Sequence, residues 1–166
     1  MHDSAAESIE PTRLRYVRLQ KEHLAEVLVL EHDSYPDPWT QGMFHQEMRN
    51  GPSHFYLAFH EDLLVAYGGF WMILDEIHIT KVTVGRPWRG QGLGRVFMTF
   101  LEARGEEAGG KVIRLEVRES NAAARGLYRN MGFEEIGIRR NYYAVSAEHA
   151  VVMVKYLAPE QGESVP

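Results

Sequence analysis

The chain has 166 residues, of which 45% are hydrophobic and 25% charged, and a formal net charge of -5, which together indicate one folded domain with a substantial core. It contains no cysteine, which excludes disulfides, thiolate metal sites and a thiol nucleophile. The acidic net charge argues against binding to nucleic acid. Residues 1–10 have no signal-peptide pattern, and no apolar run approaches the roughly 20 residues that a membrane span needs. We therefore expect a cytoplasmic protein that binds neither nucleic acid nor membrane.

The first half of the sequence predicts a strand, two helices and then three successive strands. Residues 13–19 alternate as a strand does, and residues 22–31 have helical spacing of their apolar positions. The Pro36-Asp37-Pro38 segment breaks that helix, and Thr40 is a suitable N-cap for a second, short helix that ends near Arg49. The three strands are predicted at residues 54–59, 63–74 and 76–84, the first two forming a hairpin.

The second half predicts two more helices and three more strands. Apolar residues recur three and four apart from Leu93 to about Ala108, where Gly109-Gly110 ends an amphipathic helix. Asn121 is placed to cap a helix that stops at Gly132. Strands are predicted at residues 112–117, 133–139 and 150–157. The pattern indicates a mixed α/β domain over residues 13–157, with loose polar tails at residues 1–12 and 158–166.

A glycine-rich turn, TVGRPWRGQGLGR at residues 83–95, joins the third of these strands to the long helix. Gly90, Gly92 and Gly94 allow a close backbone approach, and the free N–H groups at a helix start attract anions, so the turn could hold a pyrophosphate. It lacks the Lys-Ser/Thr of a P-loop and the complete G-x-G-x-x-G of a dinucleotide-binding fold. A glycine-rich loop without a ligand remains the alternative.

The segment RGQGLG at residues 89–94 resembles the R/Q-x-x-G-x-G/A signature of the GNAT superfamily of N-acetyltransferases, which holds the pyrophosphate of coenzyme A. The stretches LEVRESNAAARGLYRNMGF at residues 115–133 and IRRNYY at 138–143 are similar to the RimI-type enzymes, which acetylate protein N-termini, and Asp75-Glu76 and Pro38-Trp39-Thr40 also fit that group. The resemblance implies a GNAT fold: a mostly antiparallel seven-stranded sheet, splayed between its fourth and fifth strands and flanked by about four helices. It also implies acetyl-CoA as cosubstrate and a protein or peptide N-terminus as acceptor.

The resemblance further implies which residues meet the cofactor. Val82, Thr83 and Val84 would flank its acetyl and pantetheine portion, and Asn121 would contact the pantetheine arm, although a pure capping role for Asn121 is equally compatible with the sequence. The pyrophosphate would lie against Arg89, Gly90, Gln91, Gly92, Leu93, Gly94 and Arg95.

Two side chains correspond to the proton-transfer groups of the family. Amine acylation needs a base for the incoming ammonium and an acid for the departing thiolate, and the resemblance assigns these roles to Glu116 and Tyr128. The alternatives are a solvated strand glutamate and a core tyrosine. A phenol with a pKa of about 10 and a thiol near 8.5 differ by about 2 kcal/mol, which local fields can offset.

The acceptor is addressed by weaker signals. An α-amine with a pKa near 8 loses its proton more easily than a lysine above 10, in agreement with an N-terminal acceptor. By resemblance the segment 139–143, with Arg140 and Tyr142, lines the peptide side, and Trp39 lies near the same region. His78 could approach the acceptor from the central strand, or be a structural histidine.

Other readings of the sequence remain open. Acceptors other than an N-terminus, such as lysine or a small-molecule amine, would keep the same chemistry, and a non-catalytic acyl-CoA-binding module would lack it. Eight histidines are present, but none forms a paired spacing for a metal, so no metal is expected. Lys81 and Thr83 depart from the residues that relatives often carry there, which bears on acceptor preference.

Overall fold

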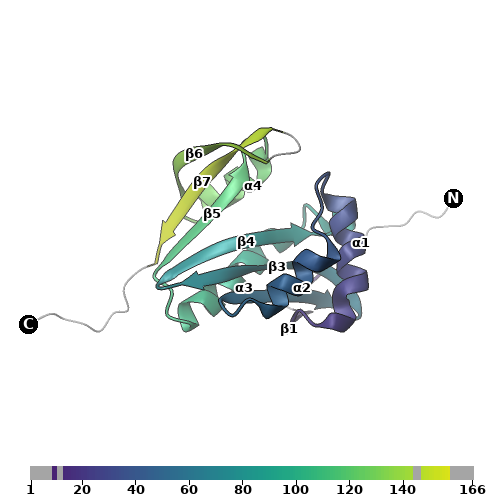
Figure 1. Ribbon diagram of the computed structural model, residues 1–166. Helices are drawn as coiled ribbons and strands as arrows, with labels where there is room; N and C mark the ends of the chain where they lie inside the picture. The colour runs from purple at the N-terminus through teal and green to yellow at the C-terminus, as the bar shows by residue number, and fades with distance from the viewer. Residues whose placement is uncertain (1–8, 11–12, 144–146, 158–166) are drawn as a thin grey trace, which may run out of the picture.

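The computed structural model describes residues 9–10, 13–143 and 147–157, and within them the chain forms one seven-stranded sheet with helices on both faces (Figure 1). The strand order is β1-β2-β3-β4-β5-β7-β6. The strands are β1 (Leu14–Arg18), β2 (Ser53–His60), β3 (Leu63–Ile73), β4 (Glu76–Val84), β5 (Val112–Arg118), β6 (Glu134–Tyr143) and β7 (Glu148–Tyr156). The helices are α1 (Leu24–Ser34), α2 (Gln41–Arg49), α3 (Leu93–Glu107) and α4 (Ala122–Asn130), with single 3-10 turns at Lys21–His23 and Arg86–Trp88. The predicted mixed α/β architecture is confirmed.

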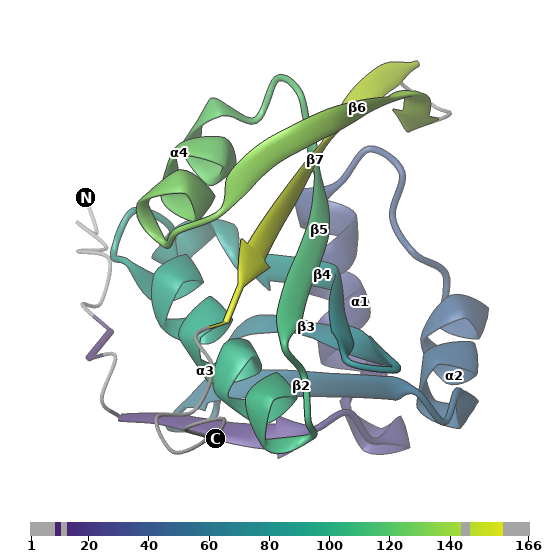
Figure 2. The ribbon, with the colours of Figure 1, turned by 90° about the vertical axis from the view of Figure 1, so that its left-hand side faces the viewer.

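All neighbouring strands are antiparallel except β4 and β5, which run parallel. Their ladder is short, pairing Glu76 with Val112, Ile77 with Ile113 and His78 with Arg114. It ends there although both strands continue, so β5, β7, β6 and α4 diverge from the rest of the sheet (Figures 1 and 2). The predicted splay between the fourth and fifth strands is confirmed.

Each face of the sheet has its own hydrophobic core. Phe97 and Leu101 of α3 are fully buried in one core, and Val27 of α1 and Phe44 of α2 are fully buried in the other. The helices are held to the sheet mainly by burial of these apolar stripes. The helices α1 and α2 thus cover one face of the sheet and α3 the other.

A bulge in β4 changes which side chains face α1. The register between β3 and β4 shifts so that Phe70 pairs with Ile79 and Gly69 with Lys81, which leaves Thr80 without a partner in the ladder. Gly68 allows the close approach, since a Cβ on it would lie 2.1 Å from the carbonyl oxygen of Lys81. A bulge reverses the alternation of the residues that follow it. Lys81 therefore points to the same face of the sheet as His78.

The hairpin of β6 and β7 is longer than the sequence predicted. The first strand was expected to end at Arg139 and runs to Tyr143, and the second was expected to begin at Ala150 and begins at Glu148. The register shifts between Arg139 and Tyr143, where Asn141 has a φ of 51°. This irregularity removes the simple alternation that identifies a strand in a sequence.

The described part of the expected N-terminal tail touches the domain. Ile9 is buried at 3% exposure in the core beneath α3, and its N–H donates to Gln91 Oε1 at 2.9 Å. The expected tail at residues 158–166 lies outside the described residues. Within the part of the chain that the structure describes, no helix is long and apolar enough to cross a membrane.

Candidate active site

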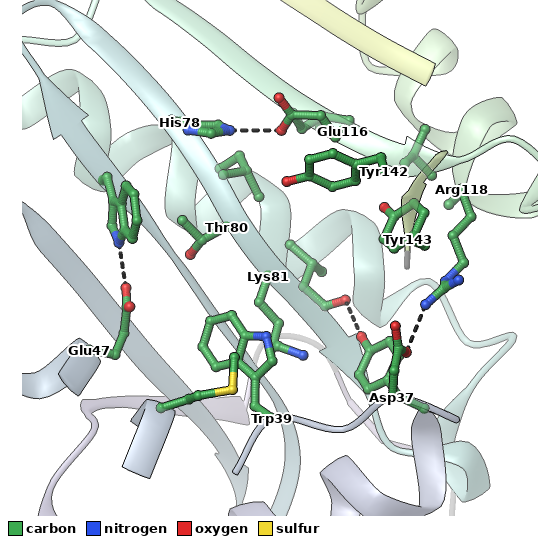
Figure 3. A pocket seen from close by; sticks show the side chains of 18 of the residues that line it. Asp37, Trp39, Glu47, His78, Thr80, Lys81, Glu116, Arg118, Tyr142 and Tyr143 are labelled. Carbon is green, nitrogen blue, oxygen red and sulfur yellow. Dashed lines mark hydrogen bonds and ion pairs between the residues drawn. The ribbon is translucent and has the colours of Figure 1, made fainter. Parts of the chain in front are cut away.

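A pocket of about 1000 Å³ lies where β4 and β5 separate, on the face covered by α1 and α2 (Figure 3). Its floor is formed by β4 and β5, and its rim by the loop between α1 and α2, by α2 and by the end of β6. Of the predicted site residues it brings together Trp39, His78, Val82, Glu116, Asn121, Tyr128 and Tyr142.

Glu116 and His78 form a pair across the splay. His78 Nε2 lies 2.7 Å from Glu116 Oε2, and the side chain of Glu116 is only 4% exposed. The other carboxylate oxygen faces two guanidinium groups, with Arg139 Nη1 at 3.3 Å and Arg114 Nε at 3.6 Å. Glu116 is therefore not a solvated strand residue, and His78 is its direct partner.

The surroundings of Glu116 keep it ionised. Burial raises the pKa of its carboxyl, but the hydrogen bond and charge of His78 and the charges of Arg114 and Arg139 lower it, and the net pKa is below the ordinary value. A carboxylate with such a pKa is anionic at neutral pH.

Tyr128 of α4 lines the same pocket from the side of β5. Tyr128 is 8% exposed, and the centroid of its ring lies 5.7 Å from that of the Phe133 ring, so it is also a core residue. Burial raises the pKa of Tyr128, and the neighbouring Tyr35 and Tyr143 raise it further. The hydroxyl therefore stays protonated until another group accepts its proton.

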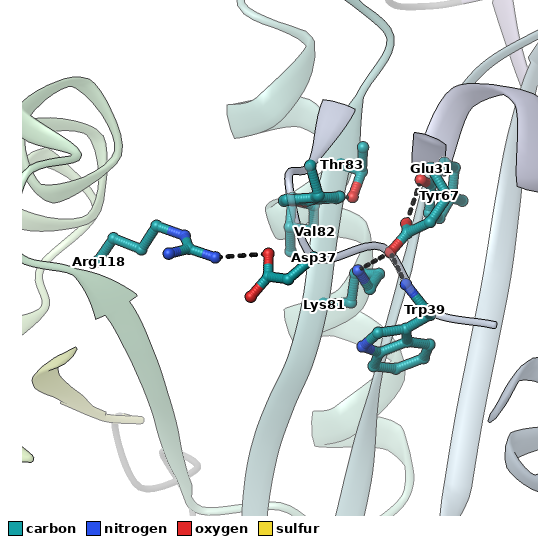
Figure 4. Close-up of polar contacts among 9 residues, drawn as sticks. Glu31, Asp37, Trp39, Tyr67, Lys81, Val82, Thr83 and Arg118 are labelled. Carbon is teal, nitrogen blue, oxygen red and sulfur yellow. Dashed lines mark hydrogen bonds and ion pairs between the residues drawn. The ribbon is translucent and has the colours of Figure 1, made fainter. Parts of the chain in front are cut away.

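An ion pair crosses the pocket at the open end of the splay. Arg118, at the end of β5, donates to Asp37 in the loop between α1 and α2 over 2.8 Å (Figure 4). The guanidinium of Arg118 also lies over the ring of Tyr143, 3.9 Å from its centroid. The backbone N–H of Asn141 donates to His149 Nδ1 at 2.9 Å, which holds the irregular end of β6 that brings both Tyr142 and Tyr143 to the pocket.

A second polar cluster surrounds the fully buried carboxylate of Glu31 on α1 (Figure 4). It accepts hydrogen bonds from Lys81 Nζ at 2.6 Å, from the backbone N–H of Trp39 at 2.9 Å and from the hydroxyl of Tyr67. Burial lowers the pKa of Lys81, the charge of Glu31 raises it, and the net pKa is below the ordinary value. The ammonium of Lys81 therefore depends on Glu31 for its charge.

The glycine-rich turn lies outside this pocket, at the start of α3. Gly90 and Gly92 have φ values of 78° and 80°, which side chains rarely adopt, and a Cβ on either would meet nothing within 4 Å. Gly92 is the N-cap of α3 and provides no side-chain hydrogen bond, so the first N–H groups of the helix stay open to an anion. The turn thus has both the free space and the donors that a pyrophosphate needs.

The other predicted residues of the turn have distinct surroundings. Arg89 Nε donates to the carbonyl of Val84 at 2.9 Å, which fixes the turn to the end of β4. The side chain of Leu93 is buried in the core, so only its backbone is available to a ligand. A Cβ on Gly94 would lie 3.4 Å from Leu127 of α4, whereas Arg95 is exposed on α3.

The remaining predicted positions are placed as follows. Thr83 is buried, with its hydroxyl bonded to Tyr35, and Val84 packs on the core beneath α3. Asn121 Oδ1 accepts from the N–H of Ala124 at 3.1 Å, which confirms the helix cap, and Asn121 also lines the pocket. Arg140 is exposed on β6 and is not among the residues that line the pocket.

The lining residues that sequence reasoning missed include Tyr35, Asp37 and Arg118. The Pro36-Asp37-Pro38 segment was interpreted only as a helix breaker. An acidic residue held between two prolines was the available signal, because the prolines restrict the backbone that carries it. Among the described residues, no group of three or more His, Asp or Glu could hold a metal ion.

Comparison with known proteins identifies the class that this fold and pocket define. Residues 24–133 match the model of the Acetyltransferase (GNAT) family, and the chain belongs to that family. The predicted class, an N-acetyltransferase with acetyl-CoA as cosubstrate, is thereby confirmed.

Individual relatives are more specific. The chain is 33% identical over 143 residues to a putative [ribosomal protein bS18]-alanine N-acetyltransferase of Bacillus subtilis, covering 86% of this chain and 95% of the relative. It is 35% identical over 121 residues to the N-alpha-acetyltransferase RimI of Mycobacterium tuberculosis, covering 70% and 75%. The crystal structure of the ribosomal-protein-S18-alanine N-acetyltransferase from Escherichia coli superposes with a TM-score of 0.79 at 28% identity, covering 90% of this chain and 99% of that one. The predicted resemblance to RimI-type enzymes is confirmed.

Proposed function

We propose that this protein transfers the acetyl group of acetyl-CoA directly to the N-terminal α-amine of a protein or peptide in the cytosol. The observation that carries the proposal is that the Glu116–His78 pair and Tyr128 line one pocket at the point where β4 and β5 separate. The relatives named as alanine N-acetyltransferases support the acceptor class. The pocket, at about 1000 Å³ and open at its rim, has room for the first residues of a peptide.

The chain's own residues fit the cofactor. Gly90 and Gly92 leave room for a pyrophosphate beside the open N–H groups of α3, and the stretch of β4 from Val82 to Val84, which does not pair with β5, runs from that turn to the pocket. Bound there, acetyl-CoA supplies an activated acyl group on a thiol leaving group. Asn121 lies beside the same route and would contact the pantetheine arm.

The Glu116–His78 pair serves as the base in this proposal. The incoming α-ammonium must lose a proton before its nitrogen can react. Glu116 is ionised and nearly inaccessible, and its contact with His78 provides a path for the proton to a ring that is 23% exposed at the pocket. We therefore assign proton removal to the pair and not to either residue alone.

Tyr128 serves as the acid. It lies across the gap from β4, and burial keeps its hydroxyl protonated. A departing thiolate beside it would take that proton, which completes the transfer without a metal.

Mass spectrometry of peptides incubated with acetyl-CoA and the protein tests the proposal. Peptides with a free Ala or Ser N-terminus should gain one acetyl group, and N-terminally blocked peptides that contain lysine should stay unmodified, because lysine is about two pK units harder to deprotonate. Preferential acetylation of lysine or of a small amine would contradict the acceptor class. Absence of turnover with every amine would indicate a non-catalytic binding module.

A further inference from the structure

The Glu31 cluster has the composition of a cation-binding cage. Lys81 Nζ lies 2.6 Å from Glu31 Oε1, 4.1 Å from the centroid of the Tyr35 ring and 4.5 Å from that of the Trp39 ring. A carboxylate combined with aromatic faces is the chemistry by which proteins bind organic ammonium groups. Here the bound cation is a side chain of the protein itself, and it is 8% exposed.

The cage adjoins the pocket that the acceptor must enter. Tyr35, Trp39 and Lys81 line the same pocket as Glu116, and Figure 3 shows Lys81 and Trp39 on the side of the pocket opposite to the Glu116–His78 pair. An acceptor whose amine meets this pair therefore extends its first residue into a space that Lys81 borders. The other charges near Lys81 are those of Asp37 and Arg118, which pair with each other.

The bulge in β4 directs the side chain of Lys81 into the cage. If β4 continued through Thr80 as a regular strand, with no bulge, Lys81 would point to the core beneath α3 and not toward α1. Glu31 is fully buried, and an unpaired buried carboxylate would attract any cation that could reach it. Lys81, a residue of the same chain, supplies the positive charge that pairs with this carboxylate.

We infer that Lys81 is a specificity-determining residue that occupies, as a built-in ammonium ligand, a cation cage beside the acceptor pocket, and so excludes acceptors that carry a second positive charge in their first residue. This inference rests on the proposed N-terminal acceptor. A basic first side chain finds the anion of the cage neutralised and its aromatic faces occupied, and it meets a like charge in a region of low dielectric. Neutral first residues meet no such opposition.

The cage itself can be tested without catalysis. Tetramethylammonium has no N–H and cannot be acetylated, so it reports on binding alone. Lys81→Ala should bind it in calorimetric titration and gain thermal stability from it, whereas the wild-type protein should do neither. The double variant Lys81→Ala/Glu31→Gln is the matched control, which keeps the aromatic rings, removes the anion and should bind at least about tenfold more weakly than Lys81→Ala.

Failure of Lys81→Ala to bind tetramethylammonium, or equal binding by the double variant, would overturn the cage. If Lys81→Ala folds poorly, recovery of soluble protein on refolding is measured with and without tetramethylammonium. Recovery that rises with the cation supports the cage, and recovery that does not respond contradicts it.

The selectivity is tested in the wild-type protein with peptides that differ only in their first residue. Arginine and citrulline have nearly the same shape and only arginine is charged, and neither side chain is an acceptor. We expect kcat/KM to be at least about tenfold lower for arginine than for citrulline, and this disadvantage of arginine to disappear or reverse in Lys81→Ala. Equal wild-type rates would overturn the inference. If neither peptide reacts while lysine or small amines do, the acceptor proposal and the inferred selectivity both fail, and the tetramethylammonium result still decides whether the cage exists.

Discussion

The residues that carry the chemistry lie on different elements, and each has a measurable signature. For the base, Glu116→Gln should reduce kcat/KM most at neutral pH, where an α-amine with a pKa near 8 is still mostly protonated. The deficit should shrink above about pH 8, as the amine loses its proton to solvent. Rates of both proteins across pH 6.5 to 9.5 provide the measurement, and a mutant-to-wild-type ratio that is constant with pH would remove Glu116 from the base role.

The same carboxylate makes stability depend on pH. Because its folded pKa is below the ordinary value of 4.5, Glu116 stabilises the fold above that value, and this contribution is lost as the pH falls through the lower folded pKa. Glu116→Gln has no such titration. Urea unfolding at pH 7 and pH 3 should therefore show a smaller acid-induced loss of stability for the mutant than for the wild type, and equal losses would count against the paired state.

Tyr128 has a packing role and a proposed role in proton transfer, and removal of its hydroxyl alone distinguishes the two. Tyr128→Phe keeps the ring against Phe133 and should retain acetyl-CoA affinity, but it should lower kcat by roughly 100-fold, because the leaving thiolate has lost its acid. Steady-state kinetics and calorimetry with acetyl-CoA measure the two effects. Full turnover by a folded mutant would show that Tyr128 has only a packing role in the core.

At the scale of elements, the turn before α3 provides a matched pair of glycines. Gly92 and Gly109 both have positive φ, 80° and 97°, and a Cβ on either meets nothing within 4 Å. Valine at either site should therefore cost similar strain, about 1 to 2 kcal/mol. Only Gly92→Val should strongly raise the dissociation constant for acetyl-CoA, since only that Cβ enters the expected pyrophosphate position. Equal affinities for the two variants would place the pyrophosphate elsewhere.

The elements also show what a sequence can and cannot predict. Periodicity located the long helix from Leu93 and the strand ending at Val84 almost to the residue, because burial of one face imposes that pattern locally. The bulge at Thr80 left no such pattern, since it depends on the glycine opposite it in β3. The side to which Lys81 points could therefore not be predicted. The contact of Glu116 with His78 depends on how two strands diverge, which is decided by the packing of the whole domain.

On the scale of the whole molecule, the N-terminal segment is linked to the cofactor turn through Ile9 and Gln91. Removal of residues 1–12 takes away a buried apolar side chain and the N–H that orients Gln91, so we expect a lower melting temperature and weaker acetyl-CoA binding. The control variant Gln91→Ala removes only the hydrogen bond and keeps Ile9 in the core, so it separates the two contributions. If the truncated chain binds acetyl-CoA as well as the full chain, the segment does not support the turn.

The short ladder between β4 and β5 could act as a hinge between the two parts of the sheet. Three residue pairs join the strands at one end, while at the other end the Asp37–Arg118 ion pair links the two halves across the open side. A rotation about the ladder would break few backbone hydrogen bonds, so widening is resisted by this ion pair together with the Glu116–His78 contact. Both of its side chains are partly exposed, at 24% and 20%, and salt weakens such pairs. We therefore expect the release of coenzyme A in stopped-flow experiments to accelerate with ionic strength in the wild type, and to be faster and less dependent on salt in Asp37→Asn.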